Sequence, residues 1–372
     1  MDLVINDRAS LRSARGQFDA DTVTIDTQRL KYRNLLPCAA KYALWAARPG
    51  GRIIVVDAGG RNAAPPPYEI SFNLVCQWLF KFIGADCRLV SLEPGRLELE
   101  RVLPQMEPGW SAGVVFSGND AEIPTLLRCL DGLVAQPELG PSQQGEIIVC
   151  GPDRETAFLA RYPGVRYLVF DTPPGPRFLI GRKKNALMAA MKAPRMAVLH
   201  ARIVLDDGAL GHVPREFDIS GPLTRVSARH GGEQPYLSMM QTDAVWSGLM
   251  TKRATRMLGE VAGADYLALM ERGPVFVDGG AFYVSRRVFE ACALHDQIAW
   301  EEAEDAEWCG RAFASGLLVD LAPGSGAVSQ TSKLSDRSAF GALEAPARRT
   351  LAALKAAEGG CRHLLMRGLG RR

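Results

Sequence analysis

From Gly113 to Ile203, short apolar segments alternate with longer helix-like ones. Their order is "GVVFSGND", "IPTLLRCLDGLVAQ", "GEIIVCGPD", a further helix, "VRYLVFD", "KKNALMAAMKA" and "RMAVLHARI". Strands that alternate with helices form a mostly parallel sheet with right-handed crossover connections. Ligands of such sheets bind at the carboxyl ends of the strands. We therefore expect an α/β domain whose functional residues directly follow its strands.

Composition indicates a soluble protein of two domains. The 372 residues are 47% hydrophobic and 23% charged, which is ordinary for globular chains. A net charge of +3 with interspersed signs argues against general nucleic-acid binding. The eight cysteines include no C-x-x-C pair, which favours reduced, buried thiols. No apolar stretch is long enough for a membrane span and the start lacks a signal-peptide core, so we expect a cytoplasmic location.

The first hundred residues show an αβ pattern of their own. A helix-like run, "LLPCAAKYALWAA", precedes "RPGGRIIVVDAGG", in which Ile53 to Val56 form an apolar strand typical of a parallel sheet. Residues 20–100 resemble the C-terminal half of a Rossmann-like S-adenosylmethionine methyltransferase. No glycine-rich cofactor loop precedes them, so residues 1–108 are interpreted as a truncated accessory domain that does not bind S-adenosylmethionine. A working methyltransferase stays open as an alternative. "LPQMEPGWSAG" is the predicted linker.

Residues 112–335 contain four segments whose order and spacing are informative. These are "VVFSGNDAEIPTLLRCLDGL", "EIIVCGPD", "GRKKNALMAA", and "VDGGAFYVSRRVFEA" followed by "WEEAEDAEWCGRA". Together they resemble the nucleotide-sugar-binding half of a family-2-type glycosyltransferase of the glycosyltransferase-A fold. The resemblance implies a Rossmann-like α/β domain over 109–343, preceded by the partial α/β domain 1–108 and followed by a basic tail, 344–372. It also implies a nucleotide-sugar donor.

Three aspartates end predicted strands of this domain. Asp120 lies in "SGND", Asp153 in "CGPD", and Asp171 at the end of "YLVFD". The resemblance implies that they contact the base and ribose of the donor. The alternative is structural, because Gly, Asn, Pro and Asp are favoured in turns for their backbone conformations alone.

A basic run, "GRKKN", comes directly before a helix-like segment. Cations at a helix N-terminus oppose the helix dipole, and an anion between them would remove that conflict. The resemblance implies that Arg182, Lys183, Lys184 and Asn185 face the nucleotide diphosphate. Lys333 in "SQTSK" is a further candidate, because the C-terminal loop of the family folds back over the diphosphate. A solvated basic turn is the alternative.

The acidic segment "WEEAEDAEW" is unusually dense in charge. Like charges at this density are tolerated in the first turn of a helix or in a site. The resemblance implies that Asp305 is the catalytic base of an inverting enzyme, with Glu304 beside it. Trp300 and Trp308 flank the cluster and are predicted to stack on sugars. A solvated helix face is the alternative.

Asp278, Gly279 and Gly280 precede the predicted strand "AFYVSRR". Glycines there let backbone come close to a bound sugar, so we assign all three to the sugar or acceptor site. A β-turn leading into an edge strand is the alternative.

The segment "VLHARIVLDDG" occupies the place where the family carries an Asp-x-Asp or a similar acidic motif that binds Mg or Mn. Here the positions read His200, Ala201 and Arg202. We favour a metal-independent site in which Arg202 contacts the diphosphate, because guanidinium binds phosphate in bidentate fashion. A metal held by His200, or by Asp206 and Asp207, and an inactive donor site remain the other two hypotheses.

The leading prediction is an inverting glycosyltransferase that moves a sugar from a nucleotide donor to a glycan or lipid-linked acceptor, with a role in surface polysaccharide assembly implied by family habit. A non-catalytic scaffold built from two degenerate enzyme domains is the rival. The tail "APARRTLAALKAAEGGCRHLLMRGLGRR" is basic and helix-like. It is predicted to pack as a final helix, with peripheral contact to an anionic membrane as the alternative.

Overall fold

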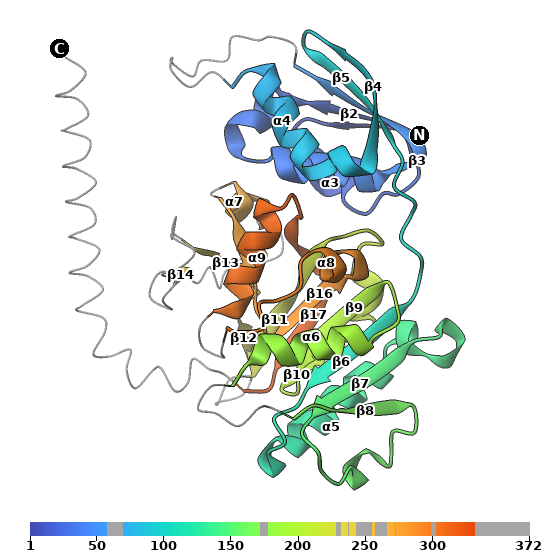
Figure 1. Cartoon of the computed structure of the whole chain (residues 1–372), viewed down its shortest axis with the longest axis vertical. Helices are drawn as coiled ribbons and strands as arrows, with labels where there is room; N and C mark the ends of the chain where they lie inside the picture. The colour runs from blue at the N-terminus through green and yellow to red at the C-terminus, as the bar shows by residue number, and fades with distance from the viewer. Residues whose placement is uncertain are drawn as a thin grey trace, which may run out of the picture. The chain divides into compact units, whose positions relative to one another are not determined.

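A computed structural model describes most of the chain (Figure 1). The described residues are 1–57, 70–171, 178–227, 232–236, 238–242, 255–256, 266–271, 273–298 and 303–331. Residues 1–330 form one compact unit. Trp300, Lys333 and the tail 344–372 lie outside the described residues, so the predictions made for them are not addressed below.

The N-terminal region is built on a sheet with the order β1-β2-β3-β5-β4. β1, β2 and β3 are parallel, and β5 and β4 complete the sheet as antiparallel strands. The bounds are β1 (Asp2–Ile5), α1 (Arg8–Ala14), β2 (Ala20–Asp26), α2 (Thr27–Leu30), α3 (Leu36–Ala46), β3 (Ala47–Val56), α4 (Phe72–Ile83), β4 (Cys87–Glu93) and β5 (Arg96–Arg101). The predicted helix and strand are therefore present, and the strand is longer than its apolar centre.

The second region, as far as the structure describes it, contains a larger sheet with the order β10-β17-β11-β16-β9-β6-β7-β8, with β12 pairing with β11. β8, β7, β6 and β9 are parallel to one another, whereas β16 runs antiparallel to both of its neighbours. The bounds are β6 (Trp110–Val115), β7 (Glu146–Gly151), β8 (Val165–Val169), β9 (Arg195–His200), β10 (Ile203–Leu205), β11 (Ile219–Ser227), β12 (Glu233–Pro235), β16 (Ala281–Ser285) and β17 (Val319–Ser329). The predicted α/β fold class is confirmed.

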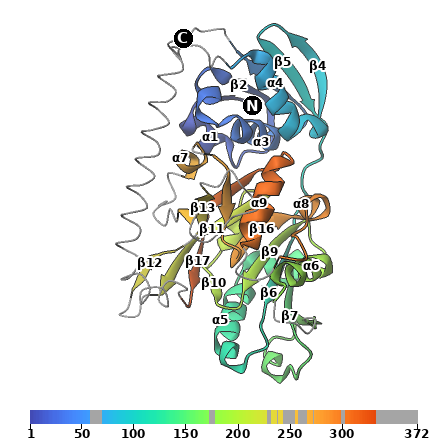
Figure 2. The same cartoon turned by 60° about the vertical axis from the view of Figure 1, so that its left-hand side comes forward.

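Helices and a small third sheet complete this region (Figure 2). The helices are α5 (Ile123–Val134), α6 (Ile180–Ala190), α7 (Tyr266–Met270), α8 (Arg286–Ala291) and α9 (Glu304–Ala314). The small sheet has the order β14-β13-β15, formed by β13 (Met239–Thr242), β14 (Thr255–Arg256) and β15 (Val275–Val277). Single 3-10 turns are Lys31–Arg33, Gly84–Asp86, Asp120–Glu122, Pro137–Leu139, Pro141–Gln143, Ala157–Leu159 and Ala209–His212.

Two expectations about elements are wrong, and one of the alternative interpretations is excluded. The helix predicted between β7 and β8 is only the 3-10 turn Ala157–Leu159. The last residues of the predicted linker belong to β6, which begins at Trp110. β16 is no edge strand, because it lies between β9 and β11.

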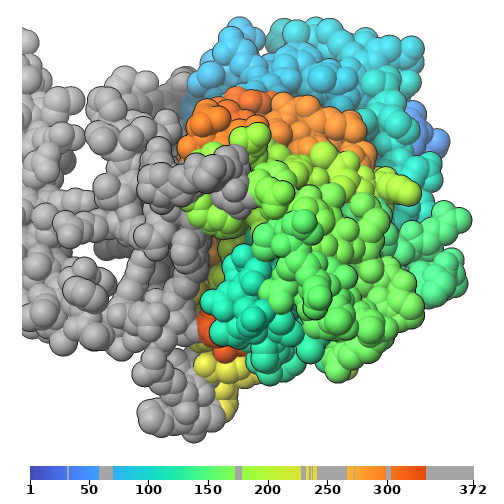
Figure 3. Space-filling view, turned by 60° about the horizontal axis from the view of Figure 1, so that its bottom comes forward, coloured from blue at the N-terminus to red at the C-terminus, as the bar shows by residue number. Residues whose placement is uncertain are grey.

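The two regions meet across α3, whose eleven residues are all buried. Apart from Lys41, α3 is apolar on every side, as expected of a helix covered on all faces. It packs on β2 and β3, and its Lys41 forms an ion pair of 2.9 Å with Asp218, just ahead of β11. Arg15 and Arg101 form further buried pairs, with Asp320 and with Glu216. In the space-filling view, the segment around α8 and α9 (orange) lies between the N-terminal region (blue) and the β6–β9 region (green) (Figure 3).

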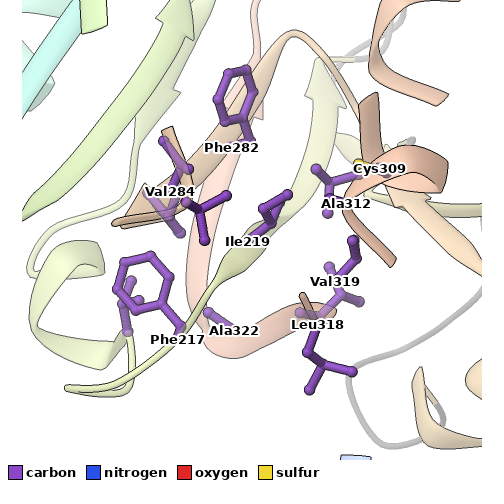
Figure 4. Packing of buried hydrophobic residues seen from close by; sticks show 14 of the residues in the cluster. Phe217, Ile219, Phe282, Val284, Cys309, Ala312, Leu318, Val319 and Ala322 are labelled. Carbon is purple, nitrogen blue, oxygen red and sulfur yellow. The ribbon is translucent and has the colours of Figure 1, made fainter. Parts of the chain in front are cut away.

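An apolar core holds β16 and α9 in place (Figure 4). Phe282 and Val284 of β16, Ile219 of β11, and Cys309 and Ala312 of α9 are all buried in it. The core thereby fixes the turn before β16 relative to the start of α9.

The seven cysteines that the structure describes are free thiols, and six of them are buried. Among the described residues, none of the helices combines the length and the apolar character that a membrane span needs.

Candidate active site

Three segments converge where β9 ends. The antiparallel pairing of β9 with β16 sets Leu199 opposite Ala281, so the turn before β16 lies beside His200. The His200 backbone N–H donates a hydrogen bond of 2.8 Å to the carbonyl of Gly280. The N-terminus of α9 reaches the same turn, because the Gly279 N–H donates to Asp305 Oδ2 at 2.8 Å. The sequence-predicted residues of these three segments therefore lie together.

The start of α9 is set by Ala303, which has a φ of +60°. A left-handed conformation is strained for a residue other than glycine, and such strain is concentrated at functional sites. It places Glu304 and Asp305 in the first helical turn, where the helix dipole favours carboxylates. Asp305 Oδ1 accepts a hydrogen bond of 2.9 Å from the Ala306 N–H.

Lys184 connects α6, the turn and α9. Its side chain is fully buried, and its Nζ donates to Glu304 Oε1 at 2.9 Å and to the Gly279 carbonyl at 2.7 Å. A buried ammonium with an ion pair and a carbonyl acceptor is well compensated for its lost hydration. Lys184 therefore holds Glu304, the neighbour of Asp305, in a fixed position.

The pKa of the Asp305 carboxyl is raised to about 7. Burial is the main cause, and the nearby charges of Glu304 and Asp278 add to it. Lys184 and the Gly279 N–H act in the opposite direction and limit the rise. A carboxyl that ionises near neutral pH is suited to accept a proton in a reaction at neutral pH.

Arg202 contributes a guanidinium that is only partly engaged. Its Nη1 donates to His200 Nδ1 at 2.7 Å, and its Nη2 lies 3.9 Å from Asp278 Oδ2. Arg202 Nε, Arg202 Nη2 and Asp278 Oδ2 are buried, and no described residue forms a hydrogen bond with them. Buried polar groups without hydrogen bonds are rare because each is destabilising by about 1 to 3 kcal/mol. An anion beside Arg202 would supply the missing acceptors.

The two glycines of the turn make room for these side chains. A Cβ on residue 280 would lie 2.6 Å from Arg202 Nη2 and 2.7 Å from Asp278 Oδ2. A Cβ on residue 279 would lie 3.0 Å from both Asp305 Oδ2 and Lys184 Nζ. Glycine at both positions is therefore explained by the close approach of charged side chains.

The residues at the end of β9 do not fit a divalent cation. Ala201 offers no ligand, and the Arg202 guanidinium lies on the side of Asp278. Arg225 binds both carboxylate oxygens of Asp206, at 2.7 and 2.9 Å, and Asp207 is an exposed residue of the turn after β10. Within the described ranges, no three His, Cys, Asp or Glu side chains are grouped as metal ligands.

The basic run is placed differently from the prediction. α6 begins at Ile180, so Lys183 and Lys184 lie within the helix and point into the protein. Lys183 Nζ donates to the Phe116 carbonyl at 2.5 Å, and burial lowers the pKa of this ammonium. Asn185 lies well inside the helix, and its Nδ2 donates to Leu294 O and Asp296 Oδ1.

The contacts of Lys183, Lys184 and Asn185 are thus internal, and their predicted approach to a diphosphate is wrong. Only Arg182 of the four is exposed. The helix begins earlier than the sequence suggested, which turns the two lysines towards the sheet.

The three aspartates at the strand ends are all exposed. The Asp153 N–H donates to Asp171 Oδ1 at 3.4 Å, so these two residues are neighbours. Asp120 accepts a hydrogen bond of 2.7 Å from Arg154, which sequence reasoning did not single out. The Arg154 guanidinium lies 5.6 Å from the Phe116 ring and 5.4 Å from the Phe158 ring. The arginine directly after "GPD" was the signal that could have identified it.

The prediction that Trp308 stacks on a sugar is wrong. Its side chain is 1% exposed, its Nε1 donates to the Cys292 carbonyl at 2.6 Å, and its ring packs on Phe282. Trp308 lies one turn after Glu304 and shares its buried helix face.

No protein-family model matches the chain, and no curated protein matches it in sequence. Among solved structures, the chain is similar to GalNAc-T7 with UDP, GalNAc and Mn2+, at 14% identity and a TM-score of 0.43, covering 75% of this chain and 59% of that one. It is also similar to S. aureus TarS 1-349, at 10% identity and a TM-score of 0.38, and to TarS 1-349 in complex with UDP-GlcNAc, at 10% identity and a TM-score of 0.39. Each TarS match covers 60% of both chains. The chain spans about three fifths of the solved structures it matches.

Proposed function

We propose that this protein is an inverting glycosyltransferase that transfers a sugar from a nucleotide-sugar donor to a hydroxyl group of a glycan or glycolipid. The observation that carries the proposal is the proximity of a carboxyl that ionises near pH 7, Asp305, to the partly engaged Arg202, where β9 ends. Glycosyl transfer needs these two groups, a base for the acceptor and a cation for the leaving diphosphate.

The reaction uses them on opposite sides of the sugar. The acceptor hydroxyl loses its proton to Asp305 as its oxygen forms a bond to the anomeric carbon. The bond from that carbon to the diphosphate breaks, and the diphosphate leaves with the electron pair. The configuration at the carbon is inverted because the new bond forms on the face opposite the leaving group. Asp305 is the catalytic residue, and the N–H groups of Gly279 and Ala306 hold it in place.

Arg202 supplies the positive charge that the leaving group requires. Its Nε and Nη2 are two N–H donors on one side of a planar guanidinium, a geometry that suits bidentate contact with phosphate oxygens once this buried side chain turns towards the donor. His200 accepts from Nη1 and so keeps the guanidinium oriented. The His-Ala-Arg sequence at the end of β9 supports a metal-independent site, because its cation is provided by the chain itself.

We assign the remaining parts of the donor to residues at the ends of strands. Asp120, Asp153 and Asp171 lie after β6, β7 and β8, where we assign the base and ribose. Asp278, Gly279 and Gly280 border the sugar, between Arg202 and the carboxylates of α9. Arg182 is the one member of the basic run whose exposure allows contact with the diphosphate.

Nucleotide binding tests the proposal directly. UDP and GDP are titrated separately into the full chain by calorimetry, with Mn2+ and again with a chelator. We expect one of them to bind equally well under both conditions, and Arg202→Met to weaken that binding. Absence of binding by either nucleotide under both conditions would overturn the donor site, and binding that requires Mn2+ would overturn metal independence.

A non-catalytic binding protein is the second candidate function. The internal contacts of Lys183, Lys184 and Asn185 favour it, because three groups expected at a donor diphosphate stabilise the fold instead. The two candidate functions predict different results for one measurement. A scaffold predicts that Asp305→Asn changes no rate of transfer, whereas a catalytic base predicts a large loss.

A further inference from the structure

An apolar cavity of about 270 Å³ lies at the junction of the two regions, away from the candidate active site. Its walls come from the start of α3, from α4, from α7 and β15, and from the end of α9 and the start of β17. Cys38, Met270, Val275 and Phe313 are among the lining residues. Open apolar pockets lined by few polar groups are where proteins bind small apolar ligands.

The side chains that line the cavity indicate which class of ligand it can bind. Most of the lining side chains are hydrocarbon or thioether groups, which offer no hydrogen bond to a sugar, a nucleotide or an ion. The polar members already have partners: Lys31 Nζ forms an ion pair of 2.9 Å with Asp57, and Asn34 Nδ2 donates to the Glu271 carbonyl. Apolar cavities bind hydrocarbons rather than water, and this volume corresponds to roughly ten carbon atoms.

The cavity reaches the surface along α4. Leu74 and Trp78 line it, and both are exposed, by 41% and 37%. They lie four residues apart on the helix and therefore form one side of an opening. Phe80 on the same helix is also 37% exposed, and Lys81 Nζ lies 5.2 Å from the Trp78 ring. Exposed apolar side chains with a neighbouring lysine are typical of helices that lie on a membrane surface.

We propose that this cavity binds a single hydrocarbon chain of a membrane lipid, which enters between Leu74 and Trp78. The exposed side chains of α4 contact the membrane surface from which the chain comes. The site does not depend on the proposed glycosyl transfer, because none of its lining residues belongs to the candidate active site.

A fluorescent fatty acid tests the proposal in the absence of membranes. The full chain is titrated with cis-parinaric acid, in which the hydrocarbon chain is itself the fluorophore and whose emission increases in an apolar environment. We expect saturable binding to one site, and a loss of at least tenfold in affinity for Trp78→Asp. Phe80→Asp is the matched control, because Phe80 has the same exposure on the same helix but does not line the cavity, and we expect it to bind as the unmodified chain does.

The outcomes separate the cavity from the surface of α4. Absence of saturable binding to the unmodified chain, or equal losses in the two variants, would overturn the proposal. Leu74→Asn repeats the test if Trp78→Asp does not fold, as judged by circular dichroism. Displacement of the probe by oleate identifies an acyl chain as the ligand, displacement by farnesyl phosphate identifies an isoprenoid chain, and displacement by neither would also overturn the proposal.

Discussion

Two arginines, one fully buried and one largely so, show how differently this protein compensates its charges. Arg101, at the end of β5, is fully buried, and its guanidinium donates to Glu216 and to the carbonyls of Leu44, Trp45, Ala47, Leu103 and Pro104. Arg202, at the candidate active site, makes one hydrogen bond through Nη1, to His200. Its Nε and Nη2 have no hydrogen bond to any described residue.

The same contrast holds for the carboxylates of the two places. Burial alone would raise the pKa of Asp218, but Lys41 and Arg287 hold it below the ordinary value. Burial raises the pKa of Asp305, and the neighbouring carboxylates Glu304 and Asp278 raise it further. The interface at α3 therefore compensates its buried charges, whereas the end of β9 gathers charges that are incompletely compensated.

Compensated and incompletely compensated buried charges therefore have different uses in this protein. Compensated pairs join the two regions and fix α3, and their removal should affect stability. Incompletely compensated groups are destabilising in the free protein and are retained where a ligand or a reaction uses them. Substitutions at the two places should consequently separate folding from function.

The largest expected effect is on stability. Arg101→Met leaves Glu216 buried without its partner and removes donors from carbonyls at the end of α3, so we expect the free energy of unfolding to fall by about 3 to 5 kcal/mol. Chemical denaturation measures it. Arg88→Met is the control: Arg88 is 67% exposed and pairs with Glu100, and its loss should change stability by less than about 1 kcal/mol. Equal losses would contradict a stabilising role for the compensated interface.

Asp305→Asn should have the largest effect on function. Asparagine still accepts the hydrogen bond from Gly279 but takes no proton, so we expect the transfer rate to fall on the order of a hundredfold or more. The free energy of unfolding should be unchanged or higher, because a carboxyl destabilised by burial is removed. Glu307→Gln on the same helix is the control, since Glu307 pairs with Arg311 away from the turn. A full transfer rate for Asp305→Asn would exclude the catalytic base.

Arg202→Lys tests whether the guanidinium group, and not only its charge, binds the diphosphate. Lysine keeps the charge but loses the planar pair of donors, so the dissociation constant of the nucleoside diphosphate should rise roughly 10- to 100-fold. Calorimetry in the presence of a chelator measures this constant. Arg225→Lys changes an arginine that is bound to Asp206 and should leave nucleotide binding as it was. The comparison fails if the two variants lose affinity equally.

The sequence predicts this site better than it predicts its surroundings. His200 ends β9 and Arg202 follows it, so their place at a strand end could be expected from the sequence. Asp278 to Gly280 join them because β16 runs antiparallel to β9, and Glu304 and Asp305 join them from the start of α9. The placement of Lys184 and Trp308 depends on where α6 and α9 begin. α6 begins at Ile180 and α9 after the left-handed Ala303, and neither start has a local sequence signal.

The buried ion pairs that join the two regions could not be predicted from local sequence patterns. Lys41 lies in an apolar helix, and its partner Asp218 is far along the chain, as Glu216 is from Arg101. Such pairs depend on how α3 packs between two sheets, which hydrophobic periodicity does not specify. The sequence of α3 indicates a buried helix and leaves open what covers it.

The pH dependence tests the pKa of Asp305 itself, with the smallest expected change. Its carboxyl is protonated below about pH 7 in the folded protein, so kcat/KM should rise by about tenfold between pH 6 and pH 8 as the base ionises. Stability should change in the opposite direction. Between the ordinary pKa of 3.8 and about 7 the folded state binds the proton that the unfolded state has lost, so the Asp305 contribution to the free energy of unfolding falls as pH rises.

Denaturation of the protein and of Asp305→Asn at pH 5 and pH 8 isolates this contribution. The protein should lose more stability than the variant between the two pH values, because only the protein must bury a charge at the higher one. If the protein and the variant show the same pH dependence, another group titrates in this range. Only the buried groups of Arg202 and Asp278 would then indicate incompletely compensated charge at the site.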